Sequence, residues 1–189
     1  MKLFFCTGNK HKVEEYRKIL APYGIKVMQR KIALVEIQSE KLEEVAKFKA
    51  KCAFEKIKHA LFVEDAGLFI RALNGFPGVY SSHALKTLGC EGILKLLRGV
   101  RNREAYFKAV IAFADQDGKL RTFTGICRGK ISLHARGSRG FGFDPIFIPN
   151  GYEKTFAEDI EMKNRVSHRR RAIDKFVKFL RDAHAGKSR

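Results

Sequence analysis

Residues 2–20 have the sequence KLFFCTGNKHKVEEYRKIL, which predicts a short buried strand followed directly by a helix. The apolar run over residues 3–6 is typical of a strand, and Val13, Tyr16 and Leu20 recur at helical spacing. Between the two elements, the turn TGN opens onto the helix N-terminus. Backbone N–H groups there lack intrahelical partners and the helix dipole is positive, so this turn is well suited to hold phosphate.

Three basic side chains occupy the predicted first turn of this helix: Lys10, His11 and Lys12. Cations at that position oppose the dipole and cost up to about 1 kcal/mol unless an anion is present. The segment matches neither the P-loop motif nor the dinucleotide-binding fingerprint. On these residues alone, a phosphate site and a solvated helix start in a basic protein explain the pattern equally well.

The composition predicts a globular protein without membrane segments. A chain of 189 residues with 45% hydrophobic content is long enough for one substantial core, and we expect a single, bilobed domain over residues 1–189. No apolar run reaches the ~18 residues needed to span a bilayer, and Met1-Lys2 leads directly into a strand rather than a signal peptide. The four cysteines form no C-x-x-C pair, which favours reduced thiols in a cytoplasmic protein.

The chain carries 38 Lys and Arg against 20 Asp and Glu, a net charge of +18. Such an excess is typical of nucleic-acid-binding proteins, but also of highly charged soluble surfaces. No helix-turn-helix, zinc-finger or arginine-glycine pattern accompanies it. The charge therefore indicates an anionic ligand without choosing between a mononucleotide and a polymer.

Alternating strand and helix patterns predict an α/β domain built around a mixed sheet. Ser39 is the expected N-cap of the second helix. The expected strands lie at residues 25–28, 32–37, 61–63, 105–114 and 120–128, with a hairpin turn at 115–118, and further helices at 81–97 and from 167 onward.

Acidic residues follow two of the expected strands. Glu64 and Asp65 come after the run at 61–63, and Glu36 lies near the end of 32–37. Open α/β folds bind ligands at strand ends, and Mg²⁺ prefers one or two carboxylates together with substrate phosphates. Gly67, just beyond the pair, is expected to let a ligand approach the backbone. A surface turn of two solvated acids is the alternative.

Two further segments carry polar or flat side chains suited to a ligand. Ser167 is a natural N-cap, which places His168 and Arg169 in a first helical turn, where both can donate to carbonyl or phosphate oxygens. Residues 140–145, GFGFDP, place aromatic rings between glycines, and bases stack on such rings. Phe143 fits a plain core position equally well.

Taken together, these segments resemble the inosine triphosphate (ITP) pyrophosphatases, which hydrolyse non-standard purine nucleoside triphosphates. The family's T-x-N-x-x-K matches Thr7, Asn9 and Lys12, and its S-H-R matches residues 167–169. Its E-D-S-G-L, G-x-P-G and F-G-[FY]-D-P resemble residues 64–68, 75–78 and 141–145, and Lys163 also matches. The motifs follow the family's order over nearly the whole chain, and jointly they are highly specific.

The resemblance implies hydrolysis of a nucleoside triphosphate to the monophosphate and pyrophosphate with Mg²⁺. It implies a homodimer whose subunit is an elongated mixed sheet with flanking helices, forming two lobes around a central cleft. Asp65 would be the catalytic acid that activates water and binds metal, with Glu36 as the other metal ligand. The remaining substrate-binding residues would be Thr7, Gly8, Asn9, Lys10, His11 and Lys12 for the triphosphate, Ala66 through its backbone, and Phe141, Gly142, Phe143, Asp144, Lys163, His168 and Arg169 around the base.

The sequence departs from the family pattern at two positions, and two alternatives remain. Ala66 replaces the usual Ser, and His11 is bulkier than the residue common there. A Maf-type nucleotide pyrophosphatase would open with S-x-S-x-x-R, against which Asn9 and Lys12 argue. A basic nucleic-acid-binding protein would bind oligonucleotides in a steeply salt-dependent way without turnover. For the enzyme, we expect only weak, non-specific binding to nucleic acid and no membrane association.

Overall fold

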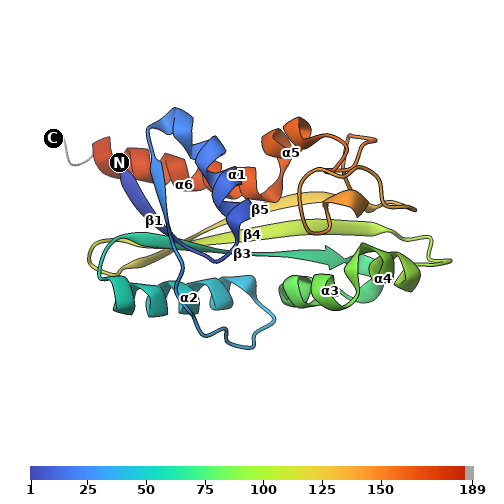
Figure 1. The fold of residues 1–189 in the computed structure, drawn as a ribbon, viewed down its shortest axis with the longest axis horizontal. Coiled ribbons are helices and arrows are strands. Elements are labelled where there is room, and N and C mark those ends of the chain that lie inside the picture. The colour runs from blue at the N-terminus through green and yellow to red at the C-terminus, as the bar shows by residue number, and fades with distance from the viewer. Residues whose placement is uncertain (186–189) are drawn as a thin grey trace. The chain divides into compact units, whose positions relative to one another are not determined.

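The computed structural model describes residues 1–185, which form an α/β fold around a six-stranded mixed sheet (Figure 1). The strand order is β2-β1-β3-β4-β5-β6. β1 is parallel to β2 and β3, whereas β5 is antiparallel to β6. The predicted fold class, a mixed sheet with flanking helices, is confirmed. The strands are β1 (Lys2–Cys6), β2 (Lys26–Arg30), β3 (Leu61–Ile70), β4 (Glu104–Ala114), β5 (Leu120–Ile131) and β6 (Phe147–Pro149).

Helices and strands alternate from β1 to β3, and pairs of helices precede and follow the strands β4 to β6. The helices are α1 (Lys10–Leu20), α2 (Leu42–Ile57), α3 (Ser81–Thr87), α4 (Gly89–Leu96), α5 (Ile160–Val166) and α6 (His168–Ala185). In the described part of the chain, no helix is both long and apolar enough to cross a membrane.

The chain divides into two compact units. Unit 1 comprises Met1–Asp65, Ala109–Gly125 and Arg169–Arg189, and unit 2 comprises Ala66–Lys108 and Ile126–His168. The chain passes from one unit to the other inside β3, β4 and β5, and again at the start of α6. Consecutive residues of one motif can therefore belong to different units.

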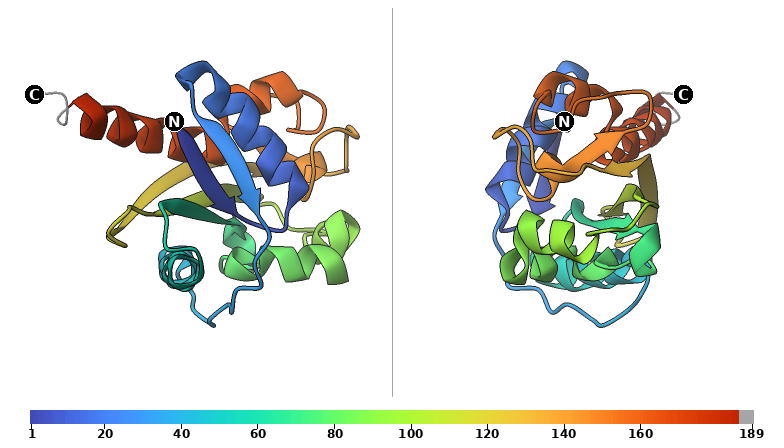
Figure 2. Two further views of the ribbon diagram at one scale, coloured as in Figure 1. Left: turned by 60° about the vertical axis from the view of Figure 1, so that its left-hand side comes forward. Right: turned by 90° about the vertical axis from the view of Figure 1, so that its right-hand side faces the viewer.

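In unit 1, α1 and α6 lie on one side of the strands and α2 lies on the other (Figure 1 and Figure 2). The parallel register pairs Phe5 of β1 with Phe62 of β3, and their rings stack with centroids 4.4 Å apart. Tyr16 of α1 and Phe176 of α6 pack on Phe62 at 5.2 and 5.5 Å. This aromatic core fixes the first strand and helix against β3, where the acidic pair lies.

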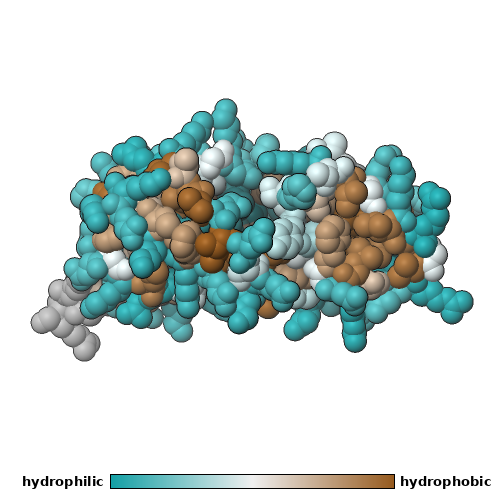
Figure 3. All heavy atoms as spheres, turned by 90° about the horizontal axis from the view of Figure 1, so that it is seen from below, coloured by the Kyte–Doolittle hydropathy of each residue, from teal (hydrophilic) through white to brown (hydrophobic). Residues whose placement is uncertain are grey.

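In unit 2, α3 and α4 lie on one side of the strands and α5 on the other (Figure 2). Phe107, Phe147 and Phe156 form an aromatic cluster in its core, with Phe107 meeting Phe147 edge-on at 4.7 Å. Apolar groups also gather at the surface over α3 and α4, at the right of Figure 3. The exposed Leu88 and Leu96 belong to this segment.

Two strand expectations were wrong. Residues 31–41 form neither strand nor helix, so Glu36 lies in an irregular segment rather than at a strand end. β2 ends at Arg30 at the edge of the sheet, and in the described chain no neighbouring strand is available to pair with residues 32–37. β3 runs for ten residues instead of ending at Val63, so Glu64 and Asp65 lie inside a strand.

Two helix expectations also need correction. The predicted helix over 81–97 is two helices, because Gly89 adopts a left-handed conformation with φ of 62° between them. α2 begins at Leu42 with Lys41 as N-cap, not after Ser39. The Ser39 hydroxyl instead accepts a hydrogen bond from the Lys41 N–H and donates one to the Glu44 carboxylate. These bonds stabilise the turn before the helix.

Candidate active site

The turn between β1 and α1 opens onto a helix N-terminus, as the sequence predicts, and the helix is capped by Asn9. The Asn9 side chain accepts a hydrogen bond from the Lys12 N–H at 3.2 Å, and the Thr7 hydroxyl accepts from the Asn9 N–H at 3.1 Å. Lys10 and His11 are exposed, and the first turn of α1 contains no acid. The turn therefore presents a helix N-terminus flanked by basic side chains, without an acid of its own.

This turn lies beside the acidic pair of β3. Because Phe5 pairs with Phe62 in parallel register, the residues that follow Cys6 continue alongside those that follow Phe62. Successive strand residues point to opposite faces, so Glu64 and Asp65 face different sides of the sheet. The partners confirm it: Glu64 contacts residues of α1 and α6, whereas Asp65 contacts a residue of α2.

Glu64 is the centre of a buried ion-pair network in unit 1. Its carboxylate accepts two hydrogen bonds from the Arg169 guanidinium, at 3.0 and 3.2 Å, and lies 3.6 Å from the Lys12 ammonium. Arg169 also pairs with Glu15. Burial raises the pKa of Glu64, but the charges of Arg169 and Lys12 outweigh it and hold that pKa below its usual value. Glu64 is therefore a carboxylate at neutral pH.

Asp65 and Glu36 converge on one ammonium group, that of Lys49 on α2. Lys49 Nζ lies 2.6 Å from Asp65 Oδ1 and 2.5 Å from Glu36 Oε1. Burial lowers the pKa of Lys49, but the charge of Asp65 and the hydrogen bonds to both carboxylates outweigh it, so that pKa is raised. The second oxygen of Asp65, Oδ2, is buried and has no hydrogen-bond partner in the described chain.

These two carboxylates are the residues that could hold a metal ion. The Lys49 ammonium marks a point at which a cation is stabilised by both of them, and the unpartnered Asp65 Oδ2 offers a further oxygen. Over residues 1–185 no group of three or more His, Cys, Asp or Glu side chains gathers in a metal-binding arrangement. Mg²⁺ does not need one, because it commonly takes one or two carboxylates plus substrate phosphates.

Sequence reasoning missed Lys49, although a signal was present. The buried residues of α2 are Leu42, Val45, Ala46, Ala50 and Ala53. Lys49 lies three residues after Ala46 and four after Val45, so it interrupts the apolar stripe of the helix. A lysine at such a position needs a buried acidic partner, which Asp65 supplies.

A second group of predicted residues comes together in unit 2. Asp144 is buried, and its Oδ2 accepts hydrogen bonds from Lys163 Nζ and from the Phe141 N–H, both at 2.7 Å. The Lys163 ammonium also lies 4.5 Å from the centroid of the Phe141 ring. Phe143 is a core residue, which was the alternative to base stacking that the sequence left open. The partly exposed Phe141 ring and the buried Lys163–Asp144 pair thus form one polar, aromatic group.

The Ser167-His168-Arg169 motif is shared between the units. His168 belongs to unit 2, where its ring stacks on Phe107 with centroids 4.6 Å apart and planes 13° from parallel. Arg169 belongs to unit 1 and is bound to Glu64 and Glu15. The motif therefore supplies His168 to unit 2 and Arg169 to the ion-pair network of unit 1.

Gly67 has a structural role that differs from the expected one. A Cβ atom on Gly67 would lie 2.2 Å from the carbonyl oxygen of Gly78, so the small residue permits close backbone packing within unit 2. The neighbouring Leu68 N–H donates to the buried Ser81 hydroxyl at 2.8 Å. Gly67 is buried, and its lack of a side chain serves this backbone packing.

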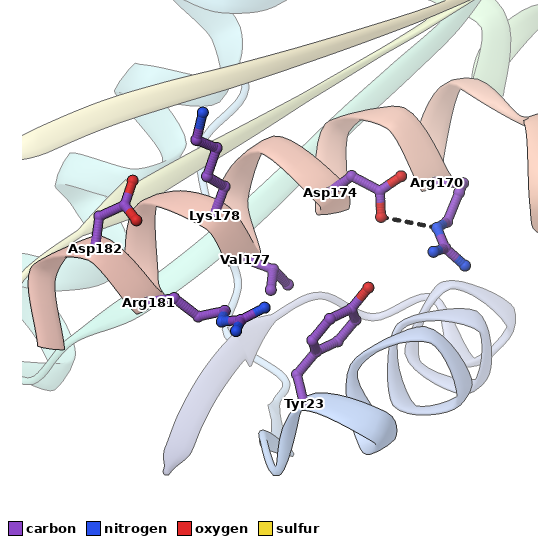
Figure 4. Close-up of a pocket in the computed structure, with 7 residues that line it drawn as sticks. All are labelled: Tyr23, Arg170, Asp174, Val177, Lys178, Arg181 and Asp182. Atoms are coloured by element: carbon purple, nitrogen blue, oxygen red, sulfur yellow. Dashed lines mark hydrogen bonds and ion pairs between the residues drawn. The ribbon is translucent and has the colours of Figure 1, made fainter. Parts of the chain in front are cut away.

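A concave surface of about 590 Å³ in unit 1 contains none of the predicted site residues (Figure 4). It lies between Tyr23 and the outer face of α6. Arg170 pairs there with Asp174 at 2.8 Å, one turn along the helix. Arg170 is thus part of a charged helix face. The residues that line this concave surface are Tyr23, Arg170, Asp174, Val177, Lys178, Arg181 and Asp182.

Known proteins match the chain over nearly its whole length. It is 52% identical to the dITP/XTP pyrophosphatase of Thermococcus kodakarensis over 96% of this chain and 98% of that protein. The dITP/XTP pyrophosphatase of Methanopyrus kandleri is 47% identical over 99% and 100%. The solved structure of the Staphylococcus aureus Ham1 protein superposes with a TM-score of 0.84 at 29% identity, covering 97% and 100%. A sequence model of the Ham1 family matches residues 3–179, and the chain belongs to that family.

Proposed function

We propose that this protein hydrolyses non-standard purine nucleoside triphosphates (ITP, dITP and XTP) to the monophosphate and pyrophosphate, which clears them from the nucleotide pool. The observation that carries the proposal is the near-full-length match to relatives named dITP/XTP pyrophosphatase. The geometry supports it, since unit 1 contains a carboxylate with one unpartnered, buried oxygen, a helix N-terminus and several cations.

Asp65 is the proposed catalytic base. Its Oδ1 is bound by the Lys49 ammonium, which fixes the orientation of the carboxylate. Its Oδ2 has no donor among the described residues, so its lone pairs can accept the proton of a water molecule. Water activated in this way would attack the α-phosphorus, and pyrophosphate would leave.

Mg²⁺ is the proposed cofactor, held by Glu36 and Asp65 together with substrate phosphates. A bound Mg²⁺ would neutralise charge that develops on the phosphate oxygens during the reaction. Lys49, which bridges the same two carboxylates, would keep them close together when no metal is bound.

The two groups of residues have separate proposed tasks. The helix N-terminus with Lys10, His11 and Lys12 would hold the triphosphate, because backbone N–H groups and cations stabilise the leaving pyrophosphate. The polar, aromatic group of unit 2 and His168 would bind the base, with donors that match a 6-oxo group. Adenine carries an amino group there and would leave those donors unpaired.

We further propose a homodimer in the cytoplasm. The apolar surface over α3 and α4, with Leu88 and Leu96 exposed, is of the kind that oligomer interfaces bury (Figure 3). The four cysteines, which form no disulfide, suit a reducing compartment. Light scattering coupled to size exclusion measures the mass, and a species of one subunit would contradict the dimer.

A product assay tests the proposed activity. The protein is incubated with Mg²⁺ and, separately, ITP, dITP, XTP, ATP and GTP, and the products are identified by chromatography. We expect monophosphate plus pyrophosphate from the first three and much slower turnover of ATP, whose 6-amino group would leave the donors unpaired, with GTP measured as a 6-oxo base that carries a 2-amino group. Release of phosphate with a nucleoside diphosphate, or binding to oligonucleotides without any turnover, would contradict the proposal.

A further inference from the structure

The buried network around Glu64 joins residues that are distant in sequence. Glu64 is 52 residues from Lys12 and 105 from Arg169, and it contacts both. Its carboxylate is fully buried, and the side chain of Arg169 is only 3% exposed. All of these residues belong to unit 1.

The geometry of these contacts is specific. The Arg169 guanidinium uses Nε and Nη2 on the two carboxylate oxygens of Glu64, which is the two-point arrangement that fixes a guanidinium in its plane. Lys12 Nζ donates to the backbone oxygen of Glu64 at 3.0 Å and lies near its carboxylate. One strand residue thus sets the position of two cations, one from α1 and one from α6.

Stability alone gives little reason for such a network. Buried ion pairs often contribute no more stability than apolar residues of similar volume, because desolvation offsets the attraction. Glu64 is buried in unit 1, whose core also contains the packed rings of Phe5, Phe62 and Tyr16. An apolar side chain at position 64 would suit that core but would leave the two cations without a shared anchor.

We infer that Glu64 is a positioning residue that holds Lys12 and Arg169 in place to receive the anionic substrate. The inference rests on the proposed function and deepens it. Asp65, the neighbour on the opposite face of β3, is bound by Lys49 and is the proposed base, whereas Glu64 acts only through the two cations. Of these two consecutive acids, Asp65 thus serves the chemical step and Glu64 serves substrate binding.

The test compares steady-state kinetics of wild type, Glu64→Gln and Tyr16→Phe with ITP and Mg²⁺ at a temperature where all are folded. Glutamine keeps the shape but removes the charge that anchors both cations. We expect the KM of Glu64→Gln to rise roughly tenfold or more, with a smaller change in kcat, because the loss of the anchor weakens substrate binding more than it slows the chemical step. Tyr16→Phe is the matched control, since the buried Tyr16 hydroxyl has no hydrogen-bond partner in the described chain.

The outcomes separate positioning from a purely structural role. A structural role predicts lower thermal stability and a lower active fraction with the wild-type KM, and that result would overturn the inference. If Glu64→Gln does not fold, Glu64→Asp retains the charge but falls short by one methylene. We expect its KM to exceed that of wild type, and an unchanged KM would again count against the inference.

A binding measurement separates this inference from the proposed function. Calorimetry with inorganic tripolyphosphate reports on the cations without any turnover. If wild type hydrolyses no nucleotide, the proposed function fails, yet weaker tripolyphosphate binding by Glu64→Gln than by wild type would still support the positioning role. If wild type hydrolyses ITP and both proteins bind tripolyphosphate equally, the positioning role fails alone.

Discussion

At the scale of single residues, the proposed chemistry depends on the unpartnered Oδ2 of Asp65. Replacing Asp65 with Asn removes the base, and we expect kcat for ITP to fall by about 10²- to 10⁴-fold. The fold should persist, because an Asn oxygen can still accept from Lys49 and Glu36 remains as the counter-charge of that lysine. Initial rates and circular dichroism check the two parts.

Asp117→Asn is the matched control for this variant, since Asp117 is an exposed turn residue of the same unit. We expect its rate to equal that of wild type. Near-normal turnover by a folded Asp65→Asn protein would assign the base to another residue.

His168 is a proposed contact of the base. Its ring is fixed by stacking on Phe107, so His168→Ala removes a placed donor. We expect the ratio of kcat/KM for ITP over ATP to fall about tenfold, because one charge-assisted or neutral hydrogen bond is lost for the 6-oxo base only. His83→Ala, an exposed histidine of α3, is the control. An unchanged ratio would remove His168 from base recognition.

Most candidate residues could be found from sequence, but their partners could not. Asp65, Glu36 and Lys163 each follow from a motif or a charge in context, whereas Lys49 emerges only when α2 is placed against β3. Arg169 was expected near the base, and the structure binds it to Glu64. Pairing between charges far apart in sequence depends on tertiary packing, which local patterns do not encode.

At the scale of elements, β3 depends on one close backbone approach. A methyl group at Gly67 would collide with the Gly78 carbonyl, which cannot move as a side chain can. We expect Gly67→Ala to lower the free energy of unfolding by about 1–3 kcal/mol, as overpacking does. Urea unfolding measures it.

Gly8→Ala is the comparison, since a Cβ at Gly8 meets nothing within 4 Å and no positive φ is involved. We expect its unfolding free energy to stay within about 0.5 kcal/mol of wild type. Equal stabilities of the two variants would contradict the packing role of Gly67.

The elements that sequence predicted well were those with a strong period and clear ends. The hairpin formed by β4 and β5 and the helices α1 and α6 lie close to their expected positions. The apolar run over residues 32–37 was misleading, because a strand needs a neighbouring strand to pair with as well as a suitable sequence. The length of β3 was underestimated because its interior holds charges that only distant partners neutralise.

At the scale of the whole molecule, ion pairs with buried acids explain only some of the 38 basic residues behind the net charge of +18. Lys12, Lys49, Lys163 and Arg169 are basic residues bound to buried or partly buried acids. Such pairs account for cations inside each unit, while many other Lys and Arg residues are exposed. The exposed excess attracts anions in general and raises encounter rates with a triphosphate.

The position of an oxygen isotope in the products tests the central claim most directly. ITP is hydrolysed by the protein with Mg²⁺ in water enriched in ¹⁸O, and the products are examined by mass spectrometry. Attack by water on the α-phosphorus predicts one ¹⁸O atom in inosine monophosphate and none in pyrophosphate. Label in pyrophosphate, or inosine diphosphate and phosphate as the products, would contradict it.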